Sequence, residues 1–214
     1  SSIAAAGPNA TDRPAAEDEP PRPVSAYGRS KLAAERLVLE AGARLPVTVV
    51  RPPNVLGPGS KELRMAIRLL RWRISPAIGD GRPRTSLVDV DDLVEALLLA
   101  AERPAALGRT YYVTDGRGYA WPEIMAALAE ELGVRGPRVR VPFRAQLLAA
   151  ALAELAARRT GRPPRLTREI VRAGRDHYWI YDGSRIEREL GFRPRYGLRD
   201  SVRRAVRAEA GARV

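Results

Sequence analysis

The chain has 214 residues, 45% of them hydrophobic, with a formal net charge of +12 and no cysteine. With no thiols and His177 as its one histidine, it excludes disulfides, thiolate metal sites and His-rich metal sites, so we expect no metal. No apolar run reaches the ~18 residues of a membrane span, so we expect a cytoplasmic protein with no membrane partner. Arginines are spread along the chain among acidic residues, and aromatics total 6%, so we expect no nucleic-acid partner.

Residues 7–24 are predicted to form a loop, because five prolines in this stretch are incompatible with a helix interior or a central strand. A helix is predicted to follow, with Ser25 as its N-cap and its end near residue 44. We expect its buried face to carry the apolar side chains of Leu32, Ala33, Leu37 and Leu39.

Beyond this helix, short β-branched runs alternate with helical segments, which is typical of an α/β fold with parallel strands. Strands are predicted at 46–51, 85–90 and 110–113, and helices at 60–74, 93–102, 121–133, 144–159, 166–175, 185–190 and 198–208. Asp91 or Asp92 is the predicted N-cap of the helix at 93–102, and turns are expected at 79–83 and 116–118. The loop at 52–59 follows a strand, where ligands bind in open α/β sheets, so its position makes it a candidate site.

Tyr27 and Lys31 are four residues apart at the start of the first long helix, so they share one helix face. An ammonium one turn from a phenol favours the phenolate, which suits the phenol for proton transfer. Lys31 and Lys61 are the chain's two lysines among 37 basic residues, and arginine does not replace a compact ammonium in such a role. From these residues alone, a catalytic pair and a chance pair on a solvated helix both remain open.

Further segments occur around this pair in a fixed order: residues 1–7, 51–59, 88–93 and 182–194. Together with Tyr27-x-x-x-Lys31, they resemble the C-terminal portion of the extended short-chain dehydrogenases/reductases, the NAD-dependent epimerase/dehydratase family. The resemblance covers essentially the whole chain. It implies a Rossmann-type, doubly wound parallel sheet at 1–56 and 85–118, and a small, mostly helical substrate-binding region at 57–84 and 119–214.

The resemblance also implies roles for individual residues and a cofactor, NAD or NADP. Tyr27 would be the general acid/base, and Lys31 would hold the nicotinamide ribose hydroxyls. Ser2 would hydrogen-bond the substrate oxygen, whereas Pro52 and Asn54 would line the nicotinamide and substrate side. The resemblance further allows a homodimer of the full-length protein.

The sequence departs from the family pattern in two places. It contains no Gly-rich loop after a first strand, so we expect a C-terminal part that lacks the N-terminal βαβ half and is inactive alone. Thr85 and Asp89 stand where many nucleotide-sugar enzymes have a diphosphate-binding Arg and a His. Arg84 is one residue away and should face elsewhere, because side chains alternate along a strand.

Three shorter segments guide the choice of substrate class. Residues 6–8, 114–116 and 161–164 resemble the branch of 3β-hydroxysteroid dehydrogenases and dihydroflavonol reductases. We therefore expect hydride transfer between a nicotinamide and a carbonyl or secondary alcohol, with Thr85 on the substrate side. A nucleotide-sugar epimerase or dehydratase, and a non-catalytic relative that binds a cofactor or partner, remain alternatives.

Overall fold

The computed structural model describes residues 1–42, 44–76, 83–135, 139–161, 166–169, 171–172 and 178–211. His177 and most of the turn predicted at 79–83 lie outside these residues. The helices are α1 (Ile3–Ala6), α2 (Ala26–Ala41), α3 (Lys61–Arg71), α4 (Val90–Glu102), η1 (Pro104–Ala106), α5 (Trp121–Glu131), α6 (Phe143–Thr160), α8 (Ser184–Leu190) and α9 (Leu198–Gly211). The strands are β1 (Val49–Arg51), β2 (Asn54–Leu56), β3 (Ile74–Pro76), β4 (Arg84–Asp89), β5 (Thr110–Tyr112), β6 (Gly118–Ala120) and β7 (Val139–Val141).

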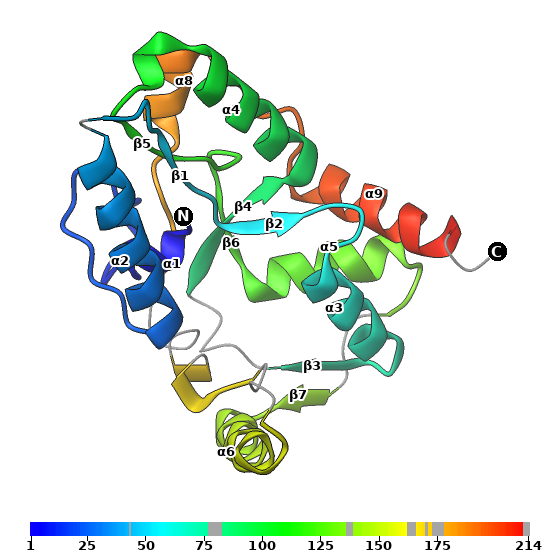
Figure 1. The fold of residues 1–214 in the computed structure, drawn as a ribbon. Coiled ribbons are helices and arrows are strands. Elements are labelled where there is room, and N and C mark those ends of the chain that lie inside the picture. The colour runs from blue at the N-terminus through cyan, green and yellow to red at the C-terminus, as the bar shows by residue number, and fades with distance from the viewer. Residues whose placement is uncertain are drawn as a thin grey trace.

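Most strand pairs in the described residues are parallel, as predicted for an α/β fold. β1 pairs with β5, β2 pairs with β4 and β3 pairs with β7, all in parallel, whereas β6 runs antiparallel to β4. In Figure 1, α2 and α4 flank the β1–β5 pair, and α3, α5 and α9 lie beside β2–β4–β6. Helices and parallel strands therefore alternate along the chain.

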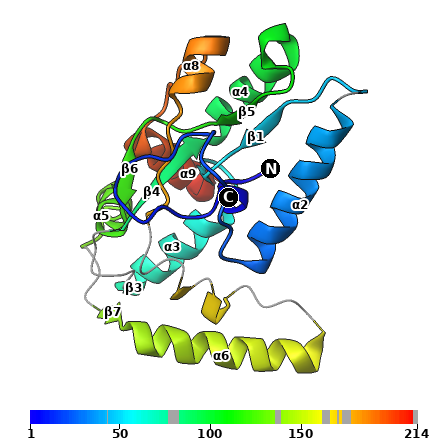
Figure 2. The ribbon, with the colours of Figure 1, turned by 90° about the vertical axis from the view of Figure 1, so that its left-hand side faces the viewer.

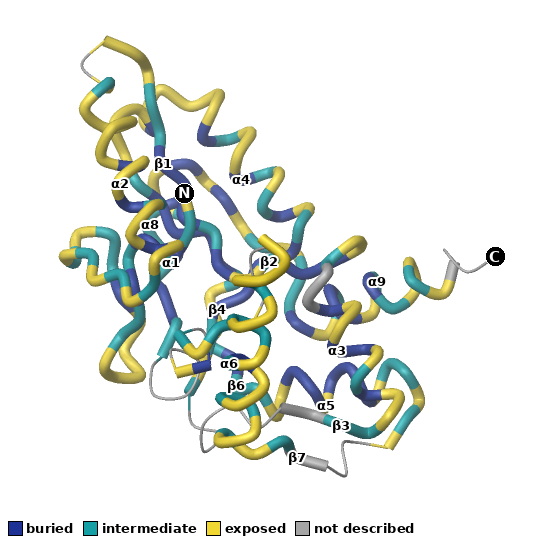
Figure 3. The backbone as a smooth tube through the Cα atoms, turned by 60° about the horizontal axis from the view of Figure 1, so that its bottom comes forward, coloured by how far each residue is buried: buried dark blue, intermediate teal, exposed yellow. Residues whose placement is uncertain are grey.

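The buried apolar side chains form separate clusters that follow this division. One cluster joins α3, α5 and α9 to β2, β4 and β6, and includes Leu70, Leu128 and Val202. A second joins β1, β4 and β5 to α4 and α8 around Tyr111 and Phe192. Figure 3 shows the contrast between these buried stretches and α6, which is mostly exposed or intermediate.

The predicted buried face of α2 is wrong apart from Leu32, which is 8% exposed. Leu37 is 67% exposed and Leu39 is 37% exposed, and Ala33 is also exposed. The residue buried with Leu32 is instead Glu35, at 5% exposed. The spacing of apolar residues predicted the wrong buried face because α2 buries the charged side chain of Glu35, which forms an ion pair inside the protein.

Two segments predicted as irregular contain strands. β2 lies inside the loop predicted at 52–59, and β6 begins in the turn predicted at 116–118. Both are three residues long and pair with β4, far away in sequence, so local patterns give little indication of them. The helix predicted at 60–74 ends at Arg71, and Ile74 begins β3.

Candidate active site

The start of α2 presents Tyr27 and Lys31 together. The Ser25 hydroxyl accepts a hydrogen bond of 2.9 Å from the Gly28 N–H, which confirms the predicted N-cap. Tyr27 is 56% exposed, and the Lys31 Nζ lies 5.6 Å from the centre of its ring. The phenol and the ammonium therefore occupy one face of the helix at its accessible end, one turn apart as the spacing predicts.

Ser2 lies next to the end of β1 and is held by a backbone contact. It is the N-cap of α1, where its Oγ accepts a 3.2 Å hydrogen bond from the Ala4 N–H. The next residue, Ile3, donates its N–H to the Pro52 carbonyl at 3.1 Å. The sequence analysis did not predict the short helix α1 that Ser2 caps. The position of Ser2 beside the residue that follows β1 brings two of the predicted site segments together.

α1 also packs closely against α2 immediately after Tyr27 (Figures 1 and 2). A Cβ atom built on Gly28 would lie 2.2 Å from the Ala4 carbonyl oxygen, closer than any two such atoms approach. Only a residue without a side chain permits this backbone contact. Gly28 therefore lets the segment that carries Ser2 lie against the helix that carries Tyr27.

Asn54 and Thr85, both predicted to face the substrate, are in contact. Asn54 begins β2 and Thr85 lies in β4, and the Asn54 side-chain amide donates to the Thr85 hydroxyl at 3.2 Å. Asn54 is exposed and Thr85 is half-buried, so the amide oxygen of Asn54 stays available. Pro53 alone separates Asn54 from Pro52, which connects this pair to the Ser2 segment through the β1–β2 connection.

A buried ion pair that the sequence analysis missed lies between α2 and β1. Glu35 on α2 and Arg51 at the end of β1 have side chains 3% and 6% exposed. The Arg51 Nε donates to Glu35 at 3.0 Å, and the Arg51 Nη2 donates to its other carboxylate oxygen. The Ser1 hydroxyl also donates to Glu35, at 2.7 Å, and the Arg51 Nη1 donates to the Tyr112 hydroxyl at 3.1 Å.

This network joins the segments that carry the predicted site residues. Glu35 is two turns after Tyr27 and one turn after Lys31, Arg51 directly precedes Pro52, and Ser1 directly precedes Ser2. The pair thus fixes α2 against β1 and against the start of α1. One signal in the sequence could have identified this ion pair. Glu35 is a carboxylate four residues after Lys31, and Arg51 is a cation just before Pro52.

The pKa values of Glu35 and Arg51 indicate that both side chains of this ion pair are charged. Burial alone disfavours the charged carboxylate, but hydrogen bonds from Arg51 and Ser1 outweigh it and lower the pKa of Glu35. Burial likewise opposes the charge of Arg51, but its hydrogen bonds to Glu35 outweigh it and raise the pKa of Arg51. Burial raises the pKa of Tyr112, which keeps this hydroxyl neutral as an acceptor for Arg51.

The carboxylates after β4 have structural partners, and neither predicted cap is the actual one. Asp89 caps α4, since its Oδ1 accepts the Asp91 N–H at 3.0 Å. Asp92 is fully buried and accepts the backbone N–H groups of Arg195 and Tyr196 at 3.1 and 3.0 Å. Asp89 was missed as the cap because the strand was predicted to continue to residue 90, whereas α4 already begins at Val90. Asp89 also pairs with Arg204 at 2.6 Å.

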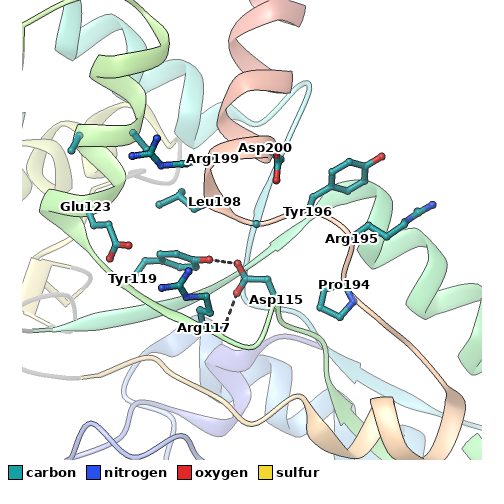
Figure 4. A pocket seen from close by; sticks show the side chains of 13 residues that line it. Asp115, Arg117, Tyr119, Glu123, Pro194, Arg195, Tyr196, Leu198, Arg199 and Asp200 are labelled. Atoms are coloured by element: carbon teal, nitrogen blue, oxygen red, sulfur yellow. Dashed lines mark hydrogen bonds between the residues drawn. The ribbon is translucent and has the colours of Figure 1, made fainter.

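A cavity of about 400 Å³ lies away from these residues, between α5 and the segment before α9. Figure 4 shows the Tyr119 hydroxyl directed at Asp115, with the Arg117 side chain beside the Tyr119 ring. Asp115 accepts hydrogen bonds from the Tyr119 hydroxyl at 2.6 Å and from the Arg117 backbone N–H at 3.1 Å. Burial raises the pKa of Asp115, although these hydrogen bonds oppose the shift. The lining includes none of the predicted site residues, so this cavity is separate from the candidate active site.

Comparison with known proteins adds an independent line of evidence. The model of the NAD dependent epimerase/dehydratase family matches residues 1–113, which include Ser2, Tyr27, Lys31 and Asn54. A ketoreductase of Stigmatella aurantiaca, named for 4-hydroxy-2-methyl-3-oxo-4-farnesyl-3,4-dihydroquinoline-1-oxide, is 35% identical over 205 residues, covering 90% of this chain and 59% of the relative. Human short-chain dehydrogenase/reductase family 42E member 1 is 31% identical over 198 residues, covering 82% of this chain and 50% of the relative. The chain thus spans about half the length of these curated relatives.

Solved structures show the same fold. MoeE5 in complex with UDP-glucose and NAD superposes with a TM-score of 0.77 at 26% identity, covering 100% of this chain and 64% of that chain. The protein gox2253 gives a TM-score of 0.74 at 26% identity, covering 99% of this chain and 65% of that chain. These matches confirm the predicted Rossmann-type α/β fold. With the family match over more than half of its residues, the chain belongs to the NAD-dependent epimerase/dehydratase family of extended short-chain dehydrogenases/reductases.

Proposed function

We propose that this chain carries the proton-transfer site of an NAD(P)-dependent oxidoreductase that acts on a carbonyl or secondary alcohol. The observation that carries the proposal is the convergence of three segments on the buried Glu35–Arg51 pair. These segments bear Ser2, Tyr27 with Lys31, and Pro52. A catalytic acid/base needs fixed geometry, and this pair fixes the position of the helix that carries the accessible phenol.

Tyr27 serves as the general acid/base in this proposal. Reduction of a carbonyl needs a proton at the oxygen, and oxidation of an alcohol needs that proton removed. The exposed hydroxyl of Tyr27 can approach such an oxygen, and the Lys31 ammonium beside its ring stabilises the oxyanion left after proton donation. The Ser2 oxygen accepts the Ala4 N–H, and among the described residues its hydroxyl donates to no acceptor, so its proton can be donated to the substrate oxygen.

The residues present fit the nicotinamide end of NAD or NADP, which supplies or accepts the hydride when bound. Lys31 is half-buried, and among the described residues no carboxylate lies within ion-pair distance of its ammonium. Its N–H donors can therefore hold the ribose hydroxyls beside Tyr27. Pro52 lies next to Ser2 through the Ile3 N–H, on the side where the nicotinamide ring would rest.

Asn54 and Thr85 form the substrate side of the site in this proposal. Their mutual hydrogen bond offers an amide and a hydroxyl, but no positive charge, to a substrate. Neighbouring Arg84 is exposed at the start of β4, whereas Thr85 is half-buried. A neutral polar pair suits an uncharged carbonyl compound better than a diphosphate. The similarity to the Stigmatella ketoreductase supports the same substrate class.

A nucleotide-sugar epimerase or dehydratase is the second candidate. It is supported by MoeE5 in complex with UDP-glucuronic acid and NAD, which is 27% identical with a TM-score of 0.76. The same tyrosine and lysine would serve, since epimerisation through a ketone also begins with proton removal from a hydroxyl. A non-catalytic relative is less favoured, because the candidate residues Ser2, Tyr27 and Lys31 are all present.

We also propose the division of labour between the two parts of the chain. Residues 1–56 and 85–118 would belong to the cofactor-binding part, and 57–84 and 119–214 mostly to the substrate-binding part. The apolar clusters support this division in part. α3, α5 and α9 pack together in one cluster and α4 packs with β1 and β5 in the other, but α8 joins the second cluster and β2 and β4 contribute to the first.

Substrate profiling distinguishes the two candidates. The full-length protein, in a preparation shown to bind NAD(P)H, is mixed with a panel of ketones and with UDP-sugars. Loss of nicotinamide absorbance and interconversion of the sugars are followed. Net NAD(P)H oxidation with a ketone supports the first candidate. Interconversion of UDP-sugars without net NAD(P)H consumption supports the second and overturns the first.

A further inference from the structure

α6 is the least buried long helix in the described part of the chain, and it lies along the base of the molecule (Figure 2). Ala150 is its one buried residue, at 0% exposed. Leu148, Leu152 and Leu155 are 62%, 58% and 51% exposed. Large apolar side chains exposed together on one face mark an interaction surface more often than singly scattered ones do.

Arginines bound this surface at both ends. At 100° per residue, Arg144, Leu148, Leu152, Leu155 and Arg159 fall within an arc of about 80°. Both arginines are exposed, so the face is a leucine stripe with a guanidinium at each end. We call these five residues the α6 stripe.

The opposite side of α6 faces the protein, and the acidic charge of the helix lies there. Glu154 accepts the Arg168 backbone N–H at 2.8 Å and pairs with its guanidinium at 2.9 Å. The Gln146 amide donates to the Val141 carbonyl at 2.7 Å. The α6 stripe therefore carries positive charge and apolar surface with no negative charge.

We infer that the α6 stripe docks the protein on an anionic lipid surface. The helix would lie in the plane of the interface with the leucines among the acyl chains. Arg144 and Arg159 lie on the same arc at its two ends, and their long side chains would reach back to place the guanidiniums at the headgroups. The overall charge of +12 acts in the same direction. No described helix is long and apolar enough to cross a bilayer, and docking of this kind needs none. This inference departs from the expectation of no membrane partner that the sequence led to.

The same observations disfavour a second copy of the chain as the occupant. The three leucines span about one heptad, whereas a coiled coil repeats its apolar pattern over at least three or four heptads. Parallel pairing of two stripes would place each arginine against its own counterpart, and antiparallel pairing would place Arg144 against Arg159. An anionic surface neutralises both charges instead.

Vesicle flotation tests this inference in about 0.15 M salt. Vesicles of phosphatidylcholine alone are compared with vesicles containing about 30 mol% phosphatidylglycerol. We expect the protein to float with the anionic vesicles only. The triple variant Leu148→Ser/Leu152→Ser/Leu155→Ser should bind them at least tenfold more weakly, and Arg144→Gln/Arg159→Gln about tenfold more weakly.

Leu37→Ser is the matched control, because Leu37 is 67% exposed on another helix, α2. It should bind the vesicles as the unaltered protein does, and circular dichroism checks that every variant is folded. The inference is overturned if the unaltered protein does not float with anionic vesicles, or if the triple variant and Leu37→Ser bind equally well. It is also overturned if sedimentation shows a dimer that the triple variant abolishes while no variant binds vesicles.

Discussion

Breaking the Glu35–Arg51 pair one partner at a time should cost far more stability than replacing both partners together. Both side chains are almost fully buried, and the carboxylate accepts hydrogen bonds from Arg51 and from Ser1. In Arg51→Met, the carboxylate keeps Ser1 alone as partner, and an uncompensated buried charge of this kind costs about 3–5 kcal/mol. Glu35→Gln leaves the guanidinium in the same position, with a cost of similar size.

The double variant Glu35→Leu/Arg51→Met removes both charges and keeps apolar volume. The main residual cost is the lost partner of Tyr112, about 1 kcal/mol. The loss for the double variant should therefore be less than half the sum of the single losses. Urea unfolding followed by far-UV circular dichroism at neutral pH measures all three values.

An exposed ion pair in the same chain provides the control. Arg13 and Glu19 form a pair with side chains 68% and 41% exposed, and Arg13→Gln should change the free energy of unfolding by less than about 1 kcal/mol. The reasoning is refuted if Glu35→Gln and Arg51→Met lower the free energy of unfolding as little as Arg13→Gln does. It is also refuted if the loss in the double variant equals the sum of the two single losses.

Acid should remove the stabilisation by Glu35. Its pKa in the folded protein lies below the value of about 4.3 expected in the unfolded chain, so the stabilisation is complete above that value. It is lost as the pH falls through the lowered folded pKa, where the carboxyl binds a proton in both states. The difference in unfolding free energy between the unaltered protein and Glu35→Gln should therefore shrink below about pH 4.

Two further predictions concern the packing around the site. Gly28→Ala should lower the free energy of unfolding by about 1–3 kcal/mol, because the added methyl would meet the Ala4 carbonyl, whereas exposed Ser30→Ala on the same helix should have little effect. A loss no greater than that of Ser30→Ala would show that α1 can move away freely. Asp92→Ala should cost about 2–4 kcal/mol, because two backbone N–H groups lose their buried acceptor, whereas exposed Asp91→Ala should cost less than about 1 kcal/mol. Thermal and urea unfolding measure both, and equal losses at Asp91 and Asp92 would contradict the second.

The sequence predicts the local features of the site well. Ser25 caps α2 as its residue type and position indicate, and the Tyr27–Lys31 spacing places both on one face. These features depend on residues within a turn or two of each other. The parallel α/β rhythm is also readable, because each element carries its own pattern of apolar and β-branched residues.

Features that depend on distant partners could not be read from the sequence. Glu35 looks like a solvated helix residue until Arg51 is known to lie against it, so the buried face of α2 was predicted partly from Leu37 and Leu39, which prove exposed. β2 is short and follows two prolines, and its strand conformation comes from pairing with β4. Likewise the contact of Asn54 with Thr85 exists because those strands are neighbours, not because of any local pattern.

The rate of nicotinamide oxidation in Tyr27→Phe tests the central claim most directly. In the full-length protein, shown to bind NAD(P)H and assayed with a ketone that the unaltered protein reduces, the variant should turn over at least about a hundredfold more slowly. Its thermal unfolding should be unchanged, because Tyr27 is 56% exposed and the hydroxyl alone is removed. A variant that is folded, binds NAD(P)H and reduces the ketone at nearly the normal rate would contradict the role proposed for Tyr27.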